Sequence, residues 1–284
     1  MTDFTYRQVG DFVELTTSDD FDLERIFECG QCFRWNADEN GVYTGVALGK
    51  AAKIYREGDK IFISGSLEDF ENIWRGYFDL DRSYAEIRAG LCTDDYMREA
   101  SSFGAGIRIL RQDKWEALCS FIISQCNNIP RIKKIVETLC CLFGEKLELF
   151  GEEYYTFPSA EKIAALTAED LAPLRSGYRA PYIINAAKMV ASGELDLEAV
   201  AQTDPNDALK TLKSLNGVGD KVANCVVLFG LQMLNAFPID VWMKKALKAH
   251  YEKGFDPEIF APYAGIAQQY MFYFARSGKD LLIS

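Results

Sequence analysis

The spacing of apolar residues changes near residue 100, and this change constrains the fold more than any other feature of the chain. Before it, residues typical of β-strands lie between glycine, asparagine and aspartate, in the segments DFVELTT (11–17), GVYTGVALG (41–49), AAKIYREG (51–58) and KIFISGS (60–66). The short connections between these segments predict an antiparallel sheet, because parallel strands need longer crossovers. One helix is also expected over residues 66–80, where Ser66 precedes acidic and helically spaced apolar residues.

After residue 100 the apolar residues recur at the i, i+3 and i+4 spacing of amphipathic helices. The segments with this spacing are 113–126, 129–144, 159–174, 179–193 and 204–215. Pro130 lies where the first turn of a helix tolerates proline, and Gly144 and Gly193 lie where two helices are expected to end. The chain is therefore predicted to be an α+β protein, with an N-terminal antiparallel sheet domain that includes helices (1–100) and an all-helical domain (101–284).

Composition and charge exclude several classes of function. With 49% hydrophobic and 26% charged residues, the chain has the balance of a soluble globular protein. The N-terminus shows no secretory signal, and the longest nearly apolar run, 222–234, is too short to span a bilayer. We expect a cytoplasmic protein with no membrane partner, associated with the nucleoid in a prokaryote or located in the nucleus in a eukaryote. The net charge of −11 argues against bulk electrostatic binding of nucleic acid, although residues 108–134 and 210–248 locally gather lysine and arginine.

The cysteines and the single histidine argue against a metal centre. Eight cysteines without a secretory signal are expected to be reduced thiols. Cys29 and Cys32 form the only CxxC pair, so no second pair completes a zinc site. The adjacent Cys140 and Cys141 suit neither zinc nor an iron–sulfur cluster. His250 is the only histidine, which weakens any hypothesis of a His-rich metal site or a Ser-His-Asp triad.

The segment LKSLNGVGDKVANCVVLFGL (212–231) is the most informative part of the chain. One predicted helix runs into Leu-Asn-Gly-Val-Gly-Asp, and a second, strongly apolar helix begins near Asp220. Gly217 and Gly219 are free to adopt positive φ, so backbone N–H groups at the start of the second helix can point at a phosphate. This helix-hairpin-helix pattern, over about residues 205–231, predicts a sequence-independent grip on DNA. The hairpin carbonyls could also hold a structural cation against a phosphate. A tight turn with glycines for packing explains the spacing alone almost as well.

Lys221 strengthens the DNA hypothesis. It lies in the first turn of the second helix, where the helix dipole disfavours a cation, and its neighbours Val222, Ala223 and Cys225 are apolar. Both effects favour a neutral, nucleophilic amine. Such an amine can attack C1′ of a deoxyribose, expel the base and remain as a Schiff base, which then permits β-elimination of the 3′ phosphate.

Asp240 lies nineteen residues after Lys221, before another apolar-periodic helix. The simplest explanation for an aspartate at such a position is an N-cap. A capping carboxylate can also stabilise the positive charge that develops on a sugar as its base leaves. The two roles are compatible.

The segments Gly-Val-Gly-x-Lys-Val-Ala-x-Cys and Pro-x-Asp-Val resemble those of the helix-hairpin-helix DNA glycosylases, and specifically the 8-oxoguanine DNA glycosylase/lyases. Four further segments fit this family in order: GQCFRW (30–35), FIISQCNNIPRI (121–132), GYRAPY (177–182) and YAGIAQQYMF (263–272). The resemblance implies a bifunctional enzyme of base excision repair, with Lys221 as nucleophile and Asp240 as its partner at the sugar. Its expected partner is duplex DNA with 8-oxoguanine opposite cytosine. We expect it to act as a monomer and to require no cofactor.

The resemblance also implies a pocket for the flipped base. Gly30 would present its backbone carbonyl to the N7–H of the lesion, a hydrogen that guanine lacks because its N7 is only an acceptor. Cys225 and Phe272 would sandwich the base, Gln268 would bind its Watson–Crick edge, and Pro238 would form part of the pocket wall. Without the family match, Cys225 and Phe272 would be assigned to the core.

On the opposite strand, the family reads the unpaired cytosine with an asparagine and two arginines and fills the gap with a tyrosine. Asn127, Arg131 and Arg179 are the matching polar residues here, and Tyr178 matches the wedge. Guanidinium donors suit cytosine, because its N3 and O2 are acceptors. An exposed arginine, considered alone, is more often only a solvated charge.

This chain departs from the family pattern at three places. A strict alignment puts Cys126 where the family has its cytosine-reading asparagine, with Asn127 next, which leaves the stringency for the opposite base open. In the family, a histidine usually lies two residues after the catalytic aspartate and contacts a phosphate. Trp242 takes that position here. The four-cysteine iron–sulfur loop of the endonuclease III and adenine-glycosylase relatives is absent, which favours the 8-oxoguanine branch.

Three other functions are compatible with parts of the sequence. An alkylpurine glycosylase of the same fold would use the aspartate alone, so Lys221 argues against it. A non-catalytic DNA-binding module would use only the hairpin and leaves Lys221, Asp240 and the Gly30 segment unexplained. A redox or zinc protein built on Cys29 and Cys32 has no second ligand pair.

Overall fold

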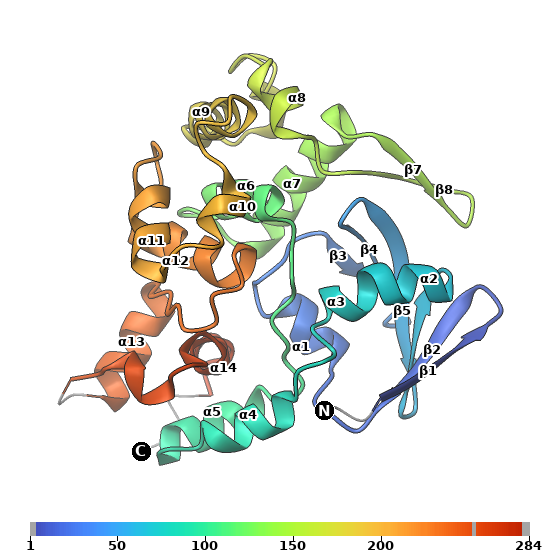
Figure 1. The fold of residues 1–284 in the computed structure, drawn as a ribbon, viewed down its shortest axis with the longest axis vertical. Helices are drawn as coiled ribbons and strands as arrows, with labels where there is room; N and C mark the ends of the chain where they lie inside the picture. Colours follow the sequence, from blue (N-terminus) through green and yellow to red (C-terminus); the bar gives the residue numbers. More distant parts are fainter. Residues whose placement is uncertain (1–3, 252–253, 280–284) are drawn as a thin grey trace. The chain divides into compact units, whose positions relative to one another are not determined.

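The structure is a computed structural model that describes residues 4–251 and 254–279 (Figure 1). The chain forms two compact units, each built from segments far apart in the sequence. The first unit takes its described residues from 1–31, 54–111 and 233–284, and the second comprises 32–53 and 112–232. The boundary that the sequence predicts between two domains near residue 100 stays a prediction.

The strands form a six-stranded antiparallel sheet in the order β1-β2-β6-β5-β4-β3, which confirms the predicted sheet. They are β1 (Phe4–Val9), β2 (Phe12–Thr17), β3 (Trp35–Ala37), β4 (Tyr43–Ala47), β5 (Lys50–Glu57) and β6 (Lys60–Ser64). The sequence pattern does not predict β1 or β3. In β1 only Phe4 and Tyr6 are even partly buried, so its apolar signal is weak. β3 has only three residues.

Nine short helical elements belong to the described part of the first unit. They are α1 (Leu23–Glu28), α2 (Leu67–Asp69), η1 (Phe70–Trp74), α3 (Arg75–Tyr77), α4 (Tyr84–Gly90), α5 (Asp95–Phe103), α13 (Val241–His250), η4 (Pro257–Phe260) and α14 (Ala264–Arg276). The helix predicted over residues 66–80 is the continuous run α2–η1–α3. It begins as expected at Ser66, whose hydroxyl accepts from the backbone N–H of Asp69 at 3.0 Å. α14 packs against α5 and α13 in the same unit (Figure 1).

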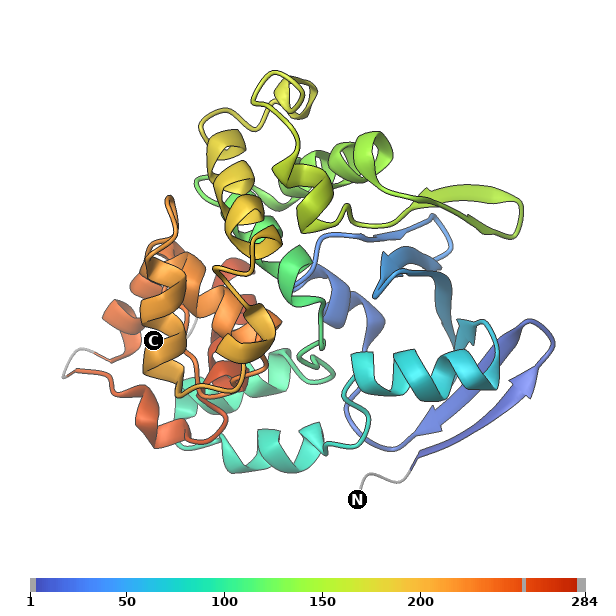
Figure 2. The same ribbon diagram turned by 45° about the horizontal axis from the view of Figure 1, so that its top comes forward.

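Four of the five helical segments predicted after residue 100 form single helices in the second unit, and the fifth, 159–174, is divided into two short helical pieces. Its helical elements are α6 (Lys114–Ile123), α7 (Ile129–Phe143), α8 (Ala160–Ala164), η2 (Ala172–Leu174), α9 (Arg179–Ala191), α10 (Leu197–Val200), α11 (Pro205–Lys213), α12 (Asp220–Cys225) and η3 (Val226–Gly230). Pro130 lies in the first turn of α7, and Gly144 caps the end of that helix, as the sequence predicts. α11 and α12 lie side by side and form the hairpin (Figures 1 and 2).

The second unit also contains a two-stranded hairpin that the helical periodicity does not predict. Its strands are β7 (Lys146–Leu149) and β8 (Glu152–Tyr155), joined through Phe150 and Gly151, both with positive φ (Figure 2). Every residue in these strands is exposed or only partly buried. Because neither face is fully buried, the alternation of apolar and polar residues that marks a strand is weak here.

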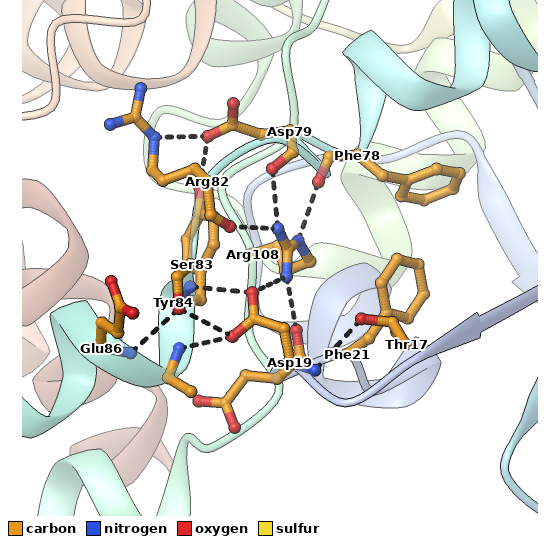
Figure 3. Close-up of polar contacts among 12 residues, drawn as sticks. Thr17, Asp19, Phe21, Phe78, Asp79, Arg82, Ser83, Tyr84, Glu86 and Arg108 are labelled. Atoms are coloured by element: carbon orange, nitrogen blue, oxygen red, sulfur yellow. Dashed lines mark hydrogen bonds and ion pairs between the residues drawn. The ribbon is translucent and has the colours of Figure 1, made fainter. Parts of the chain in front are cut away.

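A buried arginine organises the interior of the first unit (Figure 3). Arg108 is 1% exposed, and all five of its guanidinium N–H donors are used. The acceptors, at 2.7–2.9 Å, are the backbone carbonyls of Asp20, Phe78, Asp79 and Arg82 and the carboxylate of Asp19. The guanidinium carbon also lies 4.4 Å from the ring centroid of Tyr84. One side chain therefore holds two chain segments that are about sixty residues apart in sequence.

Asp19 connects the same cluster to the start of α4. Its carboxylate accepts from the backbone N–H groups of Tyr84 at 2.9 Å and Ala85 at 2.7 Å. Burial alone would raise the pKa of Asp19, but the hydrogen bonds from Ala85 and Arg108 outweigh it and hold that pKa below its usual value. The carboxylate is thus ionised where the buried guanidinium needs a counter-charge.

No helix in the described residues is long and apolar enough to cross a membrane. The same residues contain no group of three or more histidine, cysteine, aspartate or glutamate side chains that could hold a metal ion. None of the eight cysteines, all of which lie in the described residues, forms a disulfide.

Candidate active site

Lys221 lies in the first turn of α12, as predicted, because the helix begins at Asp220 after the N-cap Gly219. Its side chain is half-buried, and the following Val222 and Ala223 are buried. The amine Nζ donates to the hydroxyl Oγ of Ser124 at 3.1 Å and lies 5.4 Å from the ring centroid of Phe121. The hydrogen-bond partner of this amine is thus a neutral hydroxyl, and an aromatic ring lies near the amine.

Ser124 is a site residue that the sequence prediction missed. Its hydroxyl donates to the carbonyl of Phe121 at 2.8 Å, which leaves its lone pairs available to Lys221. Ser124 is the C-cap of α6, in the FIISQCNNIPRI segment. The segment itself was recognisable, but only the packing of α6 against α12 shows that its serine meets the lysine.

The hairpin turn uses its two glycines differently. Gly217 has φ +81°, and a Cβ there would lie 2.2 Å from the ring of Tyr182, so both conformation and space require glycine. Gly219 is the N-cap of α12 with φ −94°, and a Cβ there would meet nothing within 4 Å. The sequence suggested positive φ at both positions, but only Gly217 adopts it. Gly219 leaves open the backbone at the start of α12.

Alanine at the two glycines should therefore have unequal effects on stability. Gly217→Ala is expected to destabilise the protein by about 1–3 kcal/mol, because it adds a left-handed L-residue and a clash with Tyr182. Gly219→Ala should change the free energy of unfolding by no more than about 0.5 kcal/mol. Urea denaturation of both variants tests the contrast. Equal losses of stability in the two variants would contradict this account of the turn.

The residues matched to the opposite strand gather in the second unit, around the loop between α6 and α7. Tyr178 is 50% exposed and Arg131 is exposed. Arg131 Nη2 donates to the carbonyl of Arg175 at 3.1 Å, and Asn127 Nδ2 donates to the carbonyl of Ile123 at 3.2 Å. Arg131 and Tyr178 thus present side chains to the surface, as expected of groups that contact DNA.

Arg179 differs from Arg131, because it is 4% exposed and bonded within the protein. Its Nε donates to the carbonyl of Gln125 at 2.9 Å, its Nη1 to Ser176 at 3.0 Å and its Nη2 to Cys126 at 3.2 Å. The guanidinium also stacks on Tyr178, with its carbon 4.4 Å from the ring centroid. In this state Arg179 shapes the loop that carries Cys126, which is exposed and has φ +46°.

Asp240 is the N-cap of α13, as the sequence predicts. Its Oδ1 accepts from the backbone N–H groups of Trp242 and Met243, both at 2.9 Å. Trp242 is 38% exposed, and Lys245 Nζ lies 5.1 Å from its ring centroid. Pro238, just before Asp240, is buried. The cap fixes the direction of the carboxylate at the first turn of this helix.

The remaining predicted base-contacting residues of the first unit lie on α14 and after α1. Gln268 and Phe272 are one helical turn apart on α14. The Oε1 of Gln268 is buried without a hydrogen-bond partner among the described residues. Gly30 follows α1 with φ +84°. An unpaired buried amide oxygen is costly unless a ligand supplies its donor, so Gln268 has the character of a binding residue.

The cysteines next to Gly30 are unsuited to redox chemistry. Cys29 and Cys32 are both buried, and neither forms a disulfide. Burial raises the pKa of the Cys29 thiol to about 11, so almost no thiolate is present at neutral pH. Cys225, one turn after Lys221 on α12, is also buried.

Family models match the chain in two adjacent stretches. Residues 13–118 match the N-terminal domain of 8-oxoguanine DNA glycosylase, and residues 119–257 match the HhH-GPD superfamily of base excision DNA repair proteins. These matches agree with the α+β fold and with the resemblance seen in the sequence.

Individual relatives give the same result. An N-glycosylase/DNA lyase of Saccharomyces cerevisiae is 32% identical, over 81% of this chain and 68% of its own length. The solved structure of the Clostridium acetobutylicum 8-oxoguanine glycosylase/lyase, in complex with double-stranded DNA containing cytosine opposite 8-oxoguanine, is 39% identical, with a TM-score of 0.92 over 97% of this chain and 98% of that one. A structure of MBOgg1 in complex with a low-affinity DNA ligand is 43% identical, with the same TM-score over 97% and 99% of the two chains.

Proposed function

Because the chain belongs to the 8-oxoguanine DNA glycosylases of the HhH-GPD superfamily of base excision DNA repair proteins, we propose that it excises 8-oxoguanine from duplex DNA and then cleaves the strand. The proposed reaction uses Lys221 as a covalent nucleophile. The setting of its amine carries this proposal: half-buried, in a first helical turn and hydrogen-bonded to the hydroxyl of Ser124. A charge-paired lysine would instead have a carboxylate as the partner of its amine.

The proposed first step forms a bond from Lys221 Nζ to C1′ while the C1′–N9 bond breaks and its electron pair leaves with the base. The amine loses a proton, the sugar ring opens, and a Schiff base joins the enzyme to C1′. Positive charge develops on the sugar as the base departs, and the carboxylate of Asp240 is proposed to stabilise it. The cap bonds from Trp242 and Met243 hold that carboxylate in place.

The proposed second step is β-elimination. A base removes a proton from C2′, the C3′–O bond breaks, and the 3′ phosphate leaves with the electron pair. The iminium makes this possible because it acidifies the C2′ hydrogen. Water then hydrolyses the imine and returns Lys221 as a free amine.

For recognition of the lesion, we propose the pocket that the family match implies. The carbonyl of Gly30 accepts from the N7–H of 8-oxoguanine, and Gln268 binds the Watson–Crick edge. The unpaired Oε1 of Gln268 supports this role, because a base N–H would satisfy it. Cys225 and Phe272 are proposed to stack on the two faces of the base, with Pro238 in the wall.

For the opposite strand, we propose that Tyr178 fills the space left by the flipped nucleotide and that Arg131 contacts cytosine. The exposure of both side chains supports these roles. Arg179 and Asn127 already donate hydrogen bonds to backbone carbonyls of the protein. With Cys126 in the position of the family asparagine, the enzyme has fewer free donors for cytosine, and we propose weaker discrimination of the opposite base.

The hairpin is proposed to bind the DNA backbone. The start of α12 presents backbone N–H groups, and Gly219 leaves the backbone there uncovered by side chains. Its carbonyl oxygens are ligands of the kind that hard cations prefer, so a structural cation bridging to a phosphate fits this turn. Such a cation would add positive charge to a chain whose net charge is −11. We propose that the protein acts as a monomer, at the nucleoid of a prokaryote or in the nucleus of a eukaryote.

The test is excision by the purified protein on two duplexes that differ in one base. A duplex with 8-oxoguanine opposite cytosine is expected to release free 8-oxoguanine and to yield a cleaved strand without added alkali. Excision from the same duplex with guanine should be far slower. On a further duplex that carries 3-methyladenine, release of that base by a protein that does not release 8-oxoguanine would replace the proposal with the alkylpurine alternative. Binding without release of any base would leave only the DNA-binding module.

A further inference from the structure

Two side chains of α14 hold the backbone directly before Gly30. Gln269 is 2% exposed, and its Nε2 donates to the carbonyl of Cys29 at 2.7 Å. Arg276 Nη2 donates to the preceding carbonyl, that of Glu28. The two residues are seven positions apart, which places them two turns apart on one face of the helix. Successive carbonyls of the turn are thus bound to one rigid element.

Gly30 is the position where such support has the largest effect. A glycine has the widest choice of φ and ψ, and at φ +84° nothing intrinsic holds it in one conformation. The carbonyl of Cys29 and the nitrogen of Gly30 share one planar peptide group. The hydrogen bond from Gln269 therefore fixes the orientation of the peptide group that precedes Gly30.

The other side of Gly30 is anchored as well. Gln31 is fully buried, and its Nε2 donates to the carbonyls of Ile26 at 2.9 Å and Arg108 at 2.7 Å. Its Oε1 accepts from the backbone N–H of Leu110 at 2.9 Å. With both neighbours held, the direction of the Gly30 carbonyl is set by the protein and not by the glycine itself.

The same helix presents the base-contacting side chains of the proposed pocket. Gln268 precedes Gln269, so the two side chains leave the helix about 100° apart. One of these glutamines has an unpaired buried oxygen and the other is bonded to the turn. α14 therefore carries both Gln268, which is proposed to bind the edge of the base, and Gln269, which holds the peptide before the Gly30 carbonyl. All of these groups lie in one unit.

We propose that Gln269 is a positioning residue for lesion discrimination, which acts by orienting the Cys29–Gly30 peptide and hence the Gly30 carbonyl. This inference rests on the proposed function, in which that carbonyl distinguishes 8-oxoguanine from guanine. A purely structural glutamine would support folding only. Its loss would then lower activity on every substrate by the same factor.

The test uses Gln269→Met, which keeps the length and apolar fit of the side chain and removes the donor. Three single-turnover rates are measured with each enzyme: excision of 8-oxoguanine, excision of guanine, and cleavage of a duplex that carries a preformed abasic site. Gln269→Met is expected to lower the ratio of 8-oxoguanine to guanine excision by roughly tenfold or more, because small errors in position near reacting groups are costly. Cleavage at the abasic site, which contains no base to recognise, should stay within about twofold of wild type.

Tyr251→Phe is the matched control, because it removes a hydroxyl in the same unit that donates to Asp94 at 2.9 Å and bonds neither the Gly30 turn nor its anchors. It should lower the melting temperature without changing the ratio of the two excision rates. A parallel fall of all three rates in Gln269→Met, or an unchanged ratio, would overturn the inference while the proposed function stands. A wild-type protein that excises neither base would overturn both.

Discussion

Lys221→Gln is expected to abolish the covalent adduct that borohydride forms between the protein and DNA containing 8-oxoguanine opposite cytosine. Borohydride reduces a Schiff base to a stable amine, so trapped protein reports directly on a lysine bonded to C1′. Glutamine is one atom shorter than lysine but keeps a side-chain N–H that can donate to the hydroxyl of Ser124. It cannot form an imine, and both trapping and strand cleavage should fall by roughly a thousandfold or more.

Lys146→Gln is the matched control for this experiment. Lys146 lies on β7 and pairs with Glu153, outside the helical hairpin and the proposed chemistry. It should form the adduct at a rate near that of the wild type. An adduct that survives in Lys221→Gln would place the nucleophile elsewhere. Base release by the wild type without any adduct would show a monofunctional enzyme that uses water.

Arg108→Met is expected to cause the largest loss of stability among the substitutions considered. It removes five hydrogen bonds and leaves the carboxylate of Asp19 and four backbone carbonyls without their donor in the interior. Breaking a buried charge pair from one side costs about 3–5 kcal/mol, because the remaining charge is left uncompensated. Urea unfolding followed by circular dichroism measures this loss.

Arg98→Met provides the comparison on the surface. Arg98 pairs with Asp95 one turn earlier in α5, and both side chains are exposed. Its replacement should change the free energy of unfolding by no more than about 0.5 kcal/mol, because exposed ion pairs contribute little. A loss in Arg108→Met as small as this would show that the buried cluster repacks around an apolar side chain.

The local features of the fold could be predicted because they depend on neighbours in the sequence. The cap at Ser66, the proline in the first turn of α7 and the start of α12 at Asp220 all lie where spacing and residue type place them. The same holds for Lys221 and for Asp240 as an N-cap. Elements with little buried apolar surface, such as β1 and the β7–β8 hairpin, carry too weak a pattern to be found this way.

The sequence by itself determined the class of fold, the hairpin and the position of the lysine, because helical periodicity, capping and glycine conformation act over a few residues. Only the tertiary structure decided which partners these groups meet. Ser124 and Lys221 are ninety-seven positions apart and Gln269 and Cys29 are 240 apart, so no local pattern encodes their bonds. Arg179 also shows that a local pattern does not determine which partners a side chain meets. Its motif suggested a free donor for DNA, but burial and backbone carbonyls decide what the guanidinium binds in this state.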